Sequence, residues 1–266
     1  MKDRYGRTIN YLRVSVTDRC NLRCWYCMPA GGVTLLPRSE VLTFEEIVEV
    51  VRTAVELGVT KVRLTGGEPL VRRGIVELVS MLAEIDGIRD LAMTTNGILL
   101  ADHPEDLAGA GLHRVNVSLD AVQPERYAEI TGGGDVRRVF AGIEAARRAG
   151  LTPIKLNCVV KESSSEPDAL EVAQYARENG LEARFIHVMD PKTGTFSVVE
   201  GGRGGDCPRC NRLRLTSTGL VKPCLLSDLA FSVRDMGAEA ALRRAVLEKP
   251  AAGGPCTRNS IRAVGG

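Results

Sequence analysis

The chain has 266 residues, of which 44% are hydrophobic and 26% are charged. This composition excludes a disordered, collagen-like or coiled-coil protein, and a chain of this size buries roughly three quarters of its unfolded surface. The 35 Lys and Arg residues nearly balance the 33 Asp and Glu residues, so a net charge of +2 predicts no nucleic-acid polymer as a partner. With no apolar leader at the first residues and no run near the ~18 apolar residues of a membrane span, we expect a cytoplasmic protein without a membrane partner.

Short apolar and β-branched runs alternate with longer, helically spaced segments between residues 12 and 189. The short runs predict six strands, at Leu12–Thr17, Lys61–Thr65, Leu91–Thr95, His113–Leu119, Ile154–Val160 and Ala183–Val188. The longer segments predict helices at Phe44–Leu57, Gly74–Ile85, Val136–Ala149 and Pro167–Asn179. Thr43 with Glu46 fits a capping box, and Gly58, Gly150 and Gly180 stand where helices end.

Repeated strand–helix units predict a parallel sheet, either closed as a full or partial barrel or open and doubly wound. No dinucleotide fingerprint opens the chain, so we favour an α/β fold, a partial (β/α)6 TIM-like barrel. After Met189 the sequence becomes Gly-rich and basic, and we expect an irregular segment from Lys192 to Gly219 and one helix around Ala238–Glu248. We therefore divide the chain into a barrel over residues 1–190 and a small C-terminal iron–sulfur appendage over residues 191–266.

Eight cysteines without a secretory signal indicate metal ligands or redox groups before disulfides. Cys20, Cys24 and Cys27 form C-x3-C-x2-C just after the first predicted strand, at the end of the strands where βα-barrel active sites are built. A zinc site would want a fourth Cys or His nearby, and the sequence offers none there. Three thiolates on a [4Fe–4S] cluster leave one iron open to a ligand from outside the protein.

This triplet, with Tyr26 in the pattern C-x3-C-x-aromatic-C, resembles the radical S-adenosylmethionine (SAM) superfamily. Thr65-Gly66-Gly67-Glu68-Pro69 resembles the superfamily's GGEP motif, in which the backbone and the Glu receive the amino group of SAM. Two glycines would let the backbone approach the ligand closely. The resemblance implies a SAM site made of Tyr26, Gly67, Glu68, Thr95 and Ser118 toward the methionyl end, and Met189 at the adenine.

A second triplet, Cys207, Cys210 and Cys224, forms C-x2-C-x13-C in the C-terminal region. With the run Cys-Asn-Arg-Leu-Arg-Leu from Cys210 and the opening segment Leu12–Cys20, it resembles the GTP 3′,8-cyclases of molybdenum-cofactor biosynthesis. The resemblance implies a second [4Fe–4S] cluster, whose open iron binds guanine. It also implies that a 5′-deoxyadenosyl radical removes the ribose 3′ hydrogen of GTP, after which the carbon radical closes onto C8.

The same resemblance supplies substrate and catalytic residues. Arg13, Arg212 and Arg214 match the arginines that contact GTP, with Lys61 and Arg63 as further cations and Lys155 on the barrel floor. The terminal Gly265 and Gly266 resemble a mobile tail that reaches into the active site. An electron-donating reductant is the other expected partner, and a homodimer is compatible with these expectations.

Three departures keep alternatives open. The link from Asp190 to Asp206 is shorter than in the family, so the pocket is expected to be more open or rebuilt from Thr195–Glu200; His187 also replaces a Glu. Cys256 could be a fourth ligand that closes the open iron of the second cluster, although we expect that it is not. The alternatives are a related two-cluster radical enzyme acting on another nucleotide or a peptide, and an iron–sulfur or zinc module without catalysis.

Overall fold

The computed structural model describes residues 1–28, 34–194 and 196–256. Its described strands are β1 (Tyr11–Ser15), β2 (Lys61–Thr65), β3 (Asp90–Thr95), β4 (Arg114–Ser118), β5 (Lys155–Val160), β6 (Glu182–His187), β7 (Arg212–Leu215), β8 (Leu220–Lys222) and β9 (Phe231–Ser232). They form one sheet in the order β6-β5-β4-β3-β2-β1-β7-β8-β9. Because β1 to β7 pair with one another only in parallel, this part of the sheet is that of the predicted α/β barrel.

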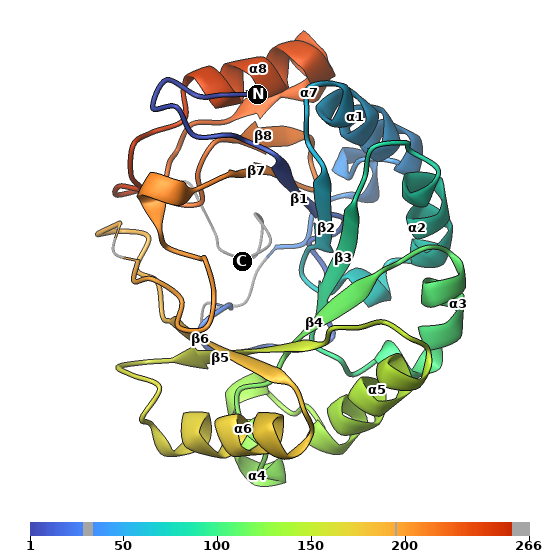
Figure 1. Ribbon diagram of the computed structural model, residues 1–266, viewed down its shortest axis with the longest axis vertical. Helices are drawn as coiled ribbons and strands as arrows, with labels where there is room; N and C mark the ends of the chain where they lie inside the picture. Colours follow the sequence, from blue (N-terminus) through green and yellow to red (C-terminus); the bar gives the residue numbers. More distant parts are fainter. Residues whose placement is uncertain (29–33, 195, 257–266) are drawn as a thin grey trace.

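Helices lie outside the curved sheet (Figure 1), and those between β1 and β6 connect successive strands, whereas the last two follow β9. They are α1 (Phe44–Glu56), α2 (Ile75–Ala83), α3 (Pro104–Gly109), α4 (Pro124–Thr131), α5 (Val136–Arg148), α6 (Pro167–Glu178), α7 (Val233–Met236) and α8 (Ala238–Leu247). Short 3-10 helices lie at Arg38–Glu40, Pro69–Val71, Leu100–Asp102 and Cys207–Arg209. The six predicted strands and five predicted helices are confirmed with small shifts of their ends, whereas α3, α4 and α7 were not predicted. In the described part of the chain, no helix combines the length and the apolar character needed to cross a membrane.

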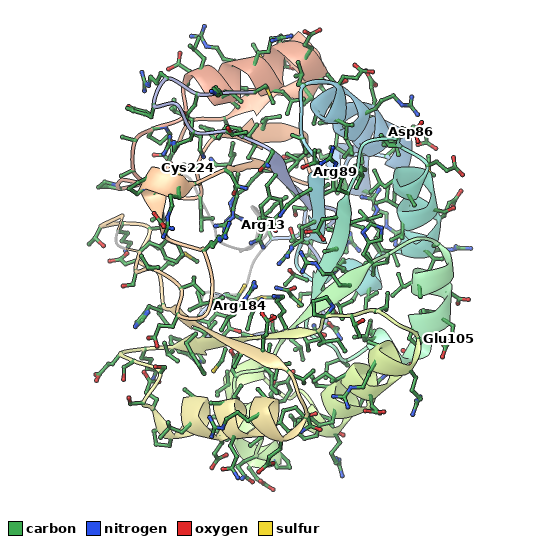
Figure 2. All side chains as sticks on the ribbon, in the orientation of Figure 1. Arg13, Asp86, Arg89, Glu105, Arg184 and Cys224 are labelled. Atoms are coloured by element: carbon green, nitrogen blue, oxygen red, sulfur yellow. The ribbon has the colours of Figure 1, made fainter. Side chains whose placement is uncertain are left out.

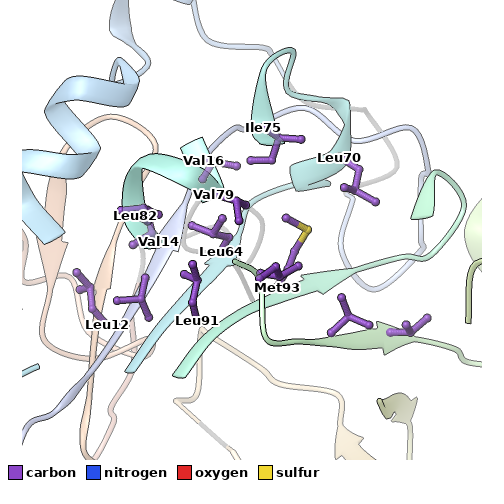
Figure 3. Packing of buried hydrophobic residues seen from close by; sticks show 14 of the residues in the cluster. Leu12, Val14, Val16, Leu64, Leu70, Ile75, Val79, Leu82, Leu91 and Met93 are labelled. Atoms are coloured by element: carbon purple, nitrogen blue, oxygen red, sulfur yellow. The ribbon is translucent and has the colours of Figure 1, made fainter. Parts of the chain in front are cut away.

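Strand alternation separates the core from the barrel interior. Leu12 and Val14 of β1 and Leu64 of β2 point outward and are fully buried against α2, as Figure 3 shows. The residues between them, such as Tyr11 and Arg13, therefore face the inside of the barrel. The hydrophobic effect thus places apolar side chains beneath the helices and leaves the interior for polar ones.

The predicted helix ends are confirmed. The Thr43 hydroxyl accepts a hydrogen bond from the Glu46 backbone N–H at 3.2 Å, and the Glu46 carboxylate accepts one from the Thr43 backbone N–H at 2.7 Å, so the capping box is present. Gly58, Gly150 and Gly180 each follow the last residues of a helix with φ of 97°, 81° and 62°. This left-handed conformation favours glycine and ends the helix.

The C-terminal region continues the sheet of the barrel. Strand β7 pairs in parallel with β1, and β8 and β9 follow as antiparallel strands. The expectation of an irregular segment through Gly219 is therefore wrong for Arg212–Leu215, because Leu213 and Leu215 are buried on the outer face while the arginines alternate with them. The boundary near residue 190 remains a prediction.

The link between β6 and β7 folds back against β6. Phe185 and Glu200 exchange two backbone hydrogen bonds of 3.1 Å, which form an antiparallel bridge. The backbone N–H of Val199 also donates to Gly204 at 2.9 Å. Glu200 thus lies against β6, whereas residue 195 lies outside the described residues, so the rebuilding of the pocket from Thr195–Glu200 stays a prediction.

Candidate active site

The first cysteine triplet lines a cavity at the carboxyl ends of the strands. Cys20, Cys24 and Cys27 share its wall with residues from the ends of β2 to β6: Thr65 to Glu68, Thr94 to Asn96, Ser118, Asn157, Val159 and Ile186 to Met189. Among the described residues, no three His, Cys, Asp or Glu side chains gather closely enough to hold a single metal ion. All three thiols border the one cavity, and a cluster whose irons each take a separate thiolate would use all three.

The two glycines of the GGEP segment pack against the loop that leads into Cys20. The Gly67 N–H donates to the Thr17 carbonyl at 2.8 Å, and the Glu68 N–H donates to the Arg19 carbonyl at 2.8 Å. A Cβ atom on Gly67 would lie 2.2 Å from the Arg19 carbonyl oxygen. Glycine is therefore required because the backbone at Gly67 lies close to the cysteine loop as well as to the cavity.

The Glu68 carboxylate holds the end of β3 beside this cavity. It accepts hydrogen bonds from the Thr95 hydroxyl at 2.8 Å, from the Leu70 N–H at 3.0 Å and from the Asn96 N–H at 2.7 Å. Burial raises the pKa of Glu68 to about 7, although these donors favour the carboxylate. Glu68 and Thr95, predicted separately as SAM contacts, are therefore bonded to each other.

Tyr26 connects the cysteine loop to β4 and β5 through Asp120. The Tyr26 hydroxyl donates to Asp120 at 2.6 Å, and the other carboxylate oxygen accepts from the Val159 N–H at 2.8 Å. Burial raises the pKa of Asp120 to about 6. Asp120 was not predicted as a site residue, although its place just after a strand end was visible in the sequence.

Five of the predicted substrate cations lie in two rows inside the barrel. Register places Arg13 beside Arg63 on one neighbouring strand and Arg214 on the other. One step earlier, Tyr11 lies between Lys61 and Arg212. Because side chains of every second residue share a face, strand pairing brings together Arg13 and Arg214 from opposite ends of the chain.

These arginines repel one another in a buried site. Burial, with Arg214 as the nearest like charge, lowers the pKa of Arg13 well below its usual value. Burial and Arg212 lower the pKa of Arg214 to about 10. In the described part of the chain, the buried Nε atoms of Arg63 and Arg212 have no hydrogen-bond partner. An anion in the barrel would offset this positive charge and accept hydrogen bonds from these two N–H groups.

A cavity of about 830 Å³ opens at the amino ends of the strands. Its wall includes Lys61, Arg63, Lys155 and Arg212, four of the predicted substrate residues, so we call it the basic cavity. Lys155 is ion-paired there with Glu182. Arg114 pairs with Asp90 at 2.7 Å, which leaves it less available to a ligand.

Arg184 of β6 is a cation of the basic cavity that the sequence reasoning missed. It reaches toward the middle of the ring from the side opposite Arg13 (Figure 2). Its buried Nε lacks a hydrogen-bond partner among the described residues. The sequence indicated its inward position, because Arg184 alternates with outward-facing residues in β6 as Arg63 does in β2.

The second triplet lines another cavity. Cys207, Cys210 and Cys224 share its wall with Arg212, Arg214 and Lys249, and with residues of the link and the C-terminal segment. Arg212 also borders the basic cavity, so the two cavities meet at this residue. Burial by itself raises the pKa of the Cys210 thiol, but Lys249 and the Arg212 N–H outweigh it, and the pKa is lowered. The cations thus favour the thiolate of Cys210, whereas burial raises the pKa of the Cys224 thiol.

The departures from the family pattern have different outcomes. Cys256 is buried, but it is not among the residues lining the second cysteine cavity, and its N–H donates to the Pro191 carbonyl at 2.8 Å. His187 lines the first cysteine cavity, and its Nε2 lies 3.1 Å from the Glu162 carbonyl oxygen. Gly265 and Gly266 lie outside the described residues, so their role is a prediction.

Comparison with known proteins agrees with this geometry. Residues 14–176 match the Radical SAM superfamily. The solved structure described as native anSMEcpe with bound AdoMet shares the fold, with a TM-score of 0.63 and 18% identity over 91% of this chain and 81% of that one. SuiB of Streptococcus suis bound to S-adenosylmethionine gives a TM-score of 0.54 and 20% identity over 69% of this chain and 41% of that one. The chain belongs to the radical SAM superfamily.

Curated relatives define the group within this superfamily. The GTP 3′,8-cyclase of Alkaliphilus oremlandii (strain OhILAs) is 41% identical over 94% of this chain and 93% of its own length. That of Thermodesulfovibrio yellowstonii is 40% identical over 88% and 87%. By these relatives, the chain is a member of the GTP 3′,8-cyclase family. The first alignment spans 298 positions, more than the 266 residues here, so that relative carries segments that this chain lacks.

Proposed function

We propose that this chain converts GTP to (8S)-3′,8-cyclo-7,8-dihydroguanosine 5′-triphosphate, the first step of molybdopterin biosynthesis. The observation that supports this most strongly is the arrangement of cations inside the barrel. Arg63, Arg13 and Arg214 form one row, and Arg212 borders both the second cysteine cavity and the basic cavity. A nucleotide would match this arrangement, with its base at the second cysteine cavity and its phosphates at the basic cavity.

The first cysteine cavity fits a [4Fe–4S] cluster with SAM. Cys20, Cys24 and Cys27 would hold three irons, and Gly67, Glu68, Thr95, Ser118 and Met189 border the same space. When bound, this pair supplies a 5′-deoxyadenosyl radical, with one electron from an external reductant. The residues of the chain position SAM: Glu68 fixes the end of β3, and Tyr26 fixes the cysteine loop through Asp120.

The second cysteine cavity and the basic cavity fit the substrate. Cys207, Cys210 and Cys224 would hold the second [4Fe–4S] cluster, next to which guanine would bind. Lys61, Arg63, Lys155 and Arg212 of the basic cavity would bind the triphosphate, with Arg13 and Arg214 between the two sites. Because a radical reacts with whatever hydrogen it meets, holding both ends of GTP is how these residues select the 3′ position.

Anaerobic turnover of the reconstituted protein tests this function. With SAM, dithionite and GTP, we expect 5′-deoxyadenosine and the cyclised nucleotide in mass spectrometry, and no cyclised product from ATP. Arg212→Ala and Arg214→Ala are expected to keep SAM cleavage but to lose cyclisation, whereas Cys24→Ala should lose both. SAM cleavage that yields no cyclised product from GTP would overturn the proposal in favour of a two-cluster radical enzyme with another substrate.

A further inference from the structure

Lys249 is a buried lysine just beyond the end of α8, with 1% of its surface exposed. Its ammonium donates to the carbonyl oxygens of Arg212 at 2.8 Å and Pro223 at 2.5 Å, and the side chain borders the same cavity as Cys210. Arg212 follows Cys210 in the sequence, and Pro223 directly precedes Cys224. One ammonium therefore joins the two chain segments that carry Cys210 and Cys224.

The charge of Lys249 has no carboxylate partner among the described ion pairs. It borders the cavity that Cys210 and Cys224 line, and these side chains become negative when they bind a metal as thiolates. A buried ammonium is costly unless a negative group compensates it. The thiolates of a metal-bound Cys210 and Cys224 are the groups placed to do so.

Arg7 also binds the backbone near the second triplet, but its charge is balanced by a carboxylate. Its guanidinium donates to the carbonyls of Cys207 at 2.8 Å and Pro250 at 2.6 Å, and it is paired with Asp3 at 2.6 Å. Arg7 therefore fixes the backbone around the second triplet through carbonyl oxygens, with its charge balanced by a carboxylate. Lys249 differs because it borders the cavity of the second triplet and has no carboxylate partner among the described ion pairs.

We propose that Lys249 is a positioning residue of the second cluster, which holds the Cys210 and Cys224 segments together and favours the reduced cluster over the oxidised one. The proposal rests on the assignment of that cluster to Cys207, Cys210 and Cys224. A reduced cluster carries one more negative charge, so a nearby cation stabilises it. Truncation of Lys249 is therefore expected to lower the reduction potential.

The test compares Lys249→Met, Lys249→Arg and Arg7→Met in the reconstituted two-cluster protein. Iron and sulfide content measures cluster loading. A dithionite redox titration followed by electron paramagnetic resonance measures the potential of the second cluster, whose signal is identified because SAM perturbs the first cluster. We expect Lys249→Met to lower the ratio of reduced to oxidised second cluster about tenfold at a fixed potential, a shift of about 59 mV for one electron. Lys249→Arg and Arg7→Met should remain near the wild-type ratio.

An unchanged ratio in Lys249→Met, or an equal shift in Arg7→Met, would overturn the proposal. If Lys249→Met cannot hold the cluster, Lys249→Gln decides: cluster loading restored by Arg but not by Gln supports a role of the charge, and loading restored by both contradicts it. Wild-type protein with iron for only one cluster would reject the site assignment itself, which separates that failure from a failure of Lys249.

Discussion

Replacing Arg13 with Met should weaken GTP binding without destabilising the fold. Arg13 lies between Arg63 and Arg214, and burial together with these like charges lowers its pKa. A lowered pKa means that folding disfavours the charged form, so the charge opposes folding at pH 7, far below the pKa of an unfolded arginine. The free energy of unfolding is therefore expected to remain unchanged or to rise by about 1 kcal/mol in Arg13→Met.

The same substitution would remove the proposed charge-assisted contact between Arg13 and GTP. Such a contact is worth about 1.5–3 kcal/mol, which raises the Kd roughly 10- to 150-fold. Anaerobic equilibrium dialysis measures the Kd, and urea denaturation measures the stability. Arg137→Met is the matched control, because Arg137 is an exposed arginine of α5 paired with Asp135 at 2.9 Å. An unchanged Kd in Arg13→Met, or an equal rise in Arg137→Met, would refute the reasoning.

Three other substitutions test separate parts of the site. Gly67→Ala should lose the first cluster and about half of the iron, because its Cβ would lie 2.2 Å from the Arg19 carbonyl oxygen. Gly109→Ala is the control and should lose no iron, because nothing lies within 4 Å of its Cβ. Full iron content in Gly67→Ala would contradict the packing of Gly67 against the cysteine loop. Cys256→Ala should keep about eight irons, and a fall to about four would make Cys256 a ligand. For Glu68, the pKa of about 7 in the folded state lies above the unfolded value of 4.5, so the folded state binds more protons between these values. Without SAM, the free energy of unfolding should fall by about 3 kcal/mol from pH 4.5 to 7 relative to Glu68→Gln, and a rise over this window in urea denaturation would contradict the assignment.

Local sequence pattern predicted most of the barrel because its strands have strong apolar signals. Lys61–Thr65 was predicted with its observed bounds, since buried parallel strands are rich in apolar and β-branched residues. Arg212–Leu215 was missed because its neighbours are basic and Gly-rich, although its Arg-Leu-Arg-Leu alternation is that of a strand. Its pairing with β1 is a contact between distant segments, which no local pattern encodes.

Motif spacing was enough to predict which cysteines share a cavity, whereas contacts between distant segments were not predicted. The cysteine triplets and the GGEP segment are short motifs that can be recognised in the sequence alone. By contrast, the bond between Glu68 and Thr95 and the position of Lys249 beside Cys210 depend on how the segments fold together. Arg184 lies between these cases, because its alternation within β6 was visible but its partners across the barrel were not.

The most direct test of the central claim follows the hydrogen that the radical removes. Reconstituted protein is incubated anaerobically with SAM, dithionite and GTP deuterated at the ribose 3′ position, and the products are analysed by mass spectrometry. Because the two cysteine cavities and the arginine rows are proposed to present this one position, deuterium is predicted in 5′-deoxyadenosine alongside the cyclised nucleotide. Formation of 5′-deoxyadenosine without deuterium, with GTP recovered intact, would contradict the account.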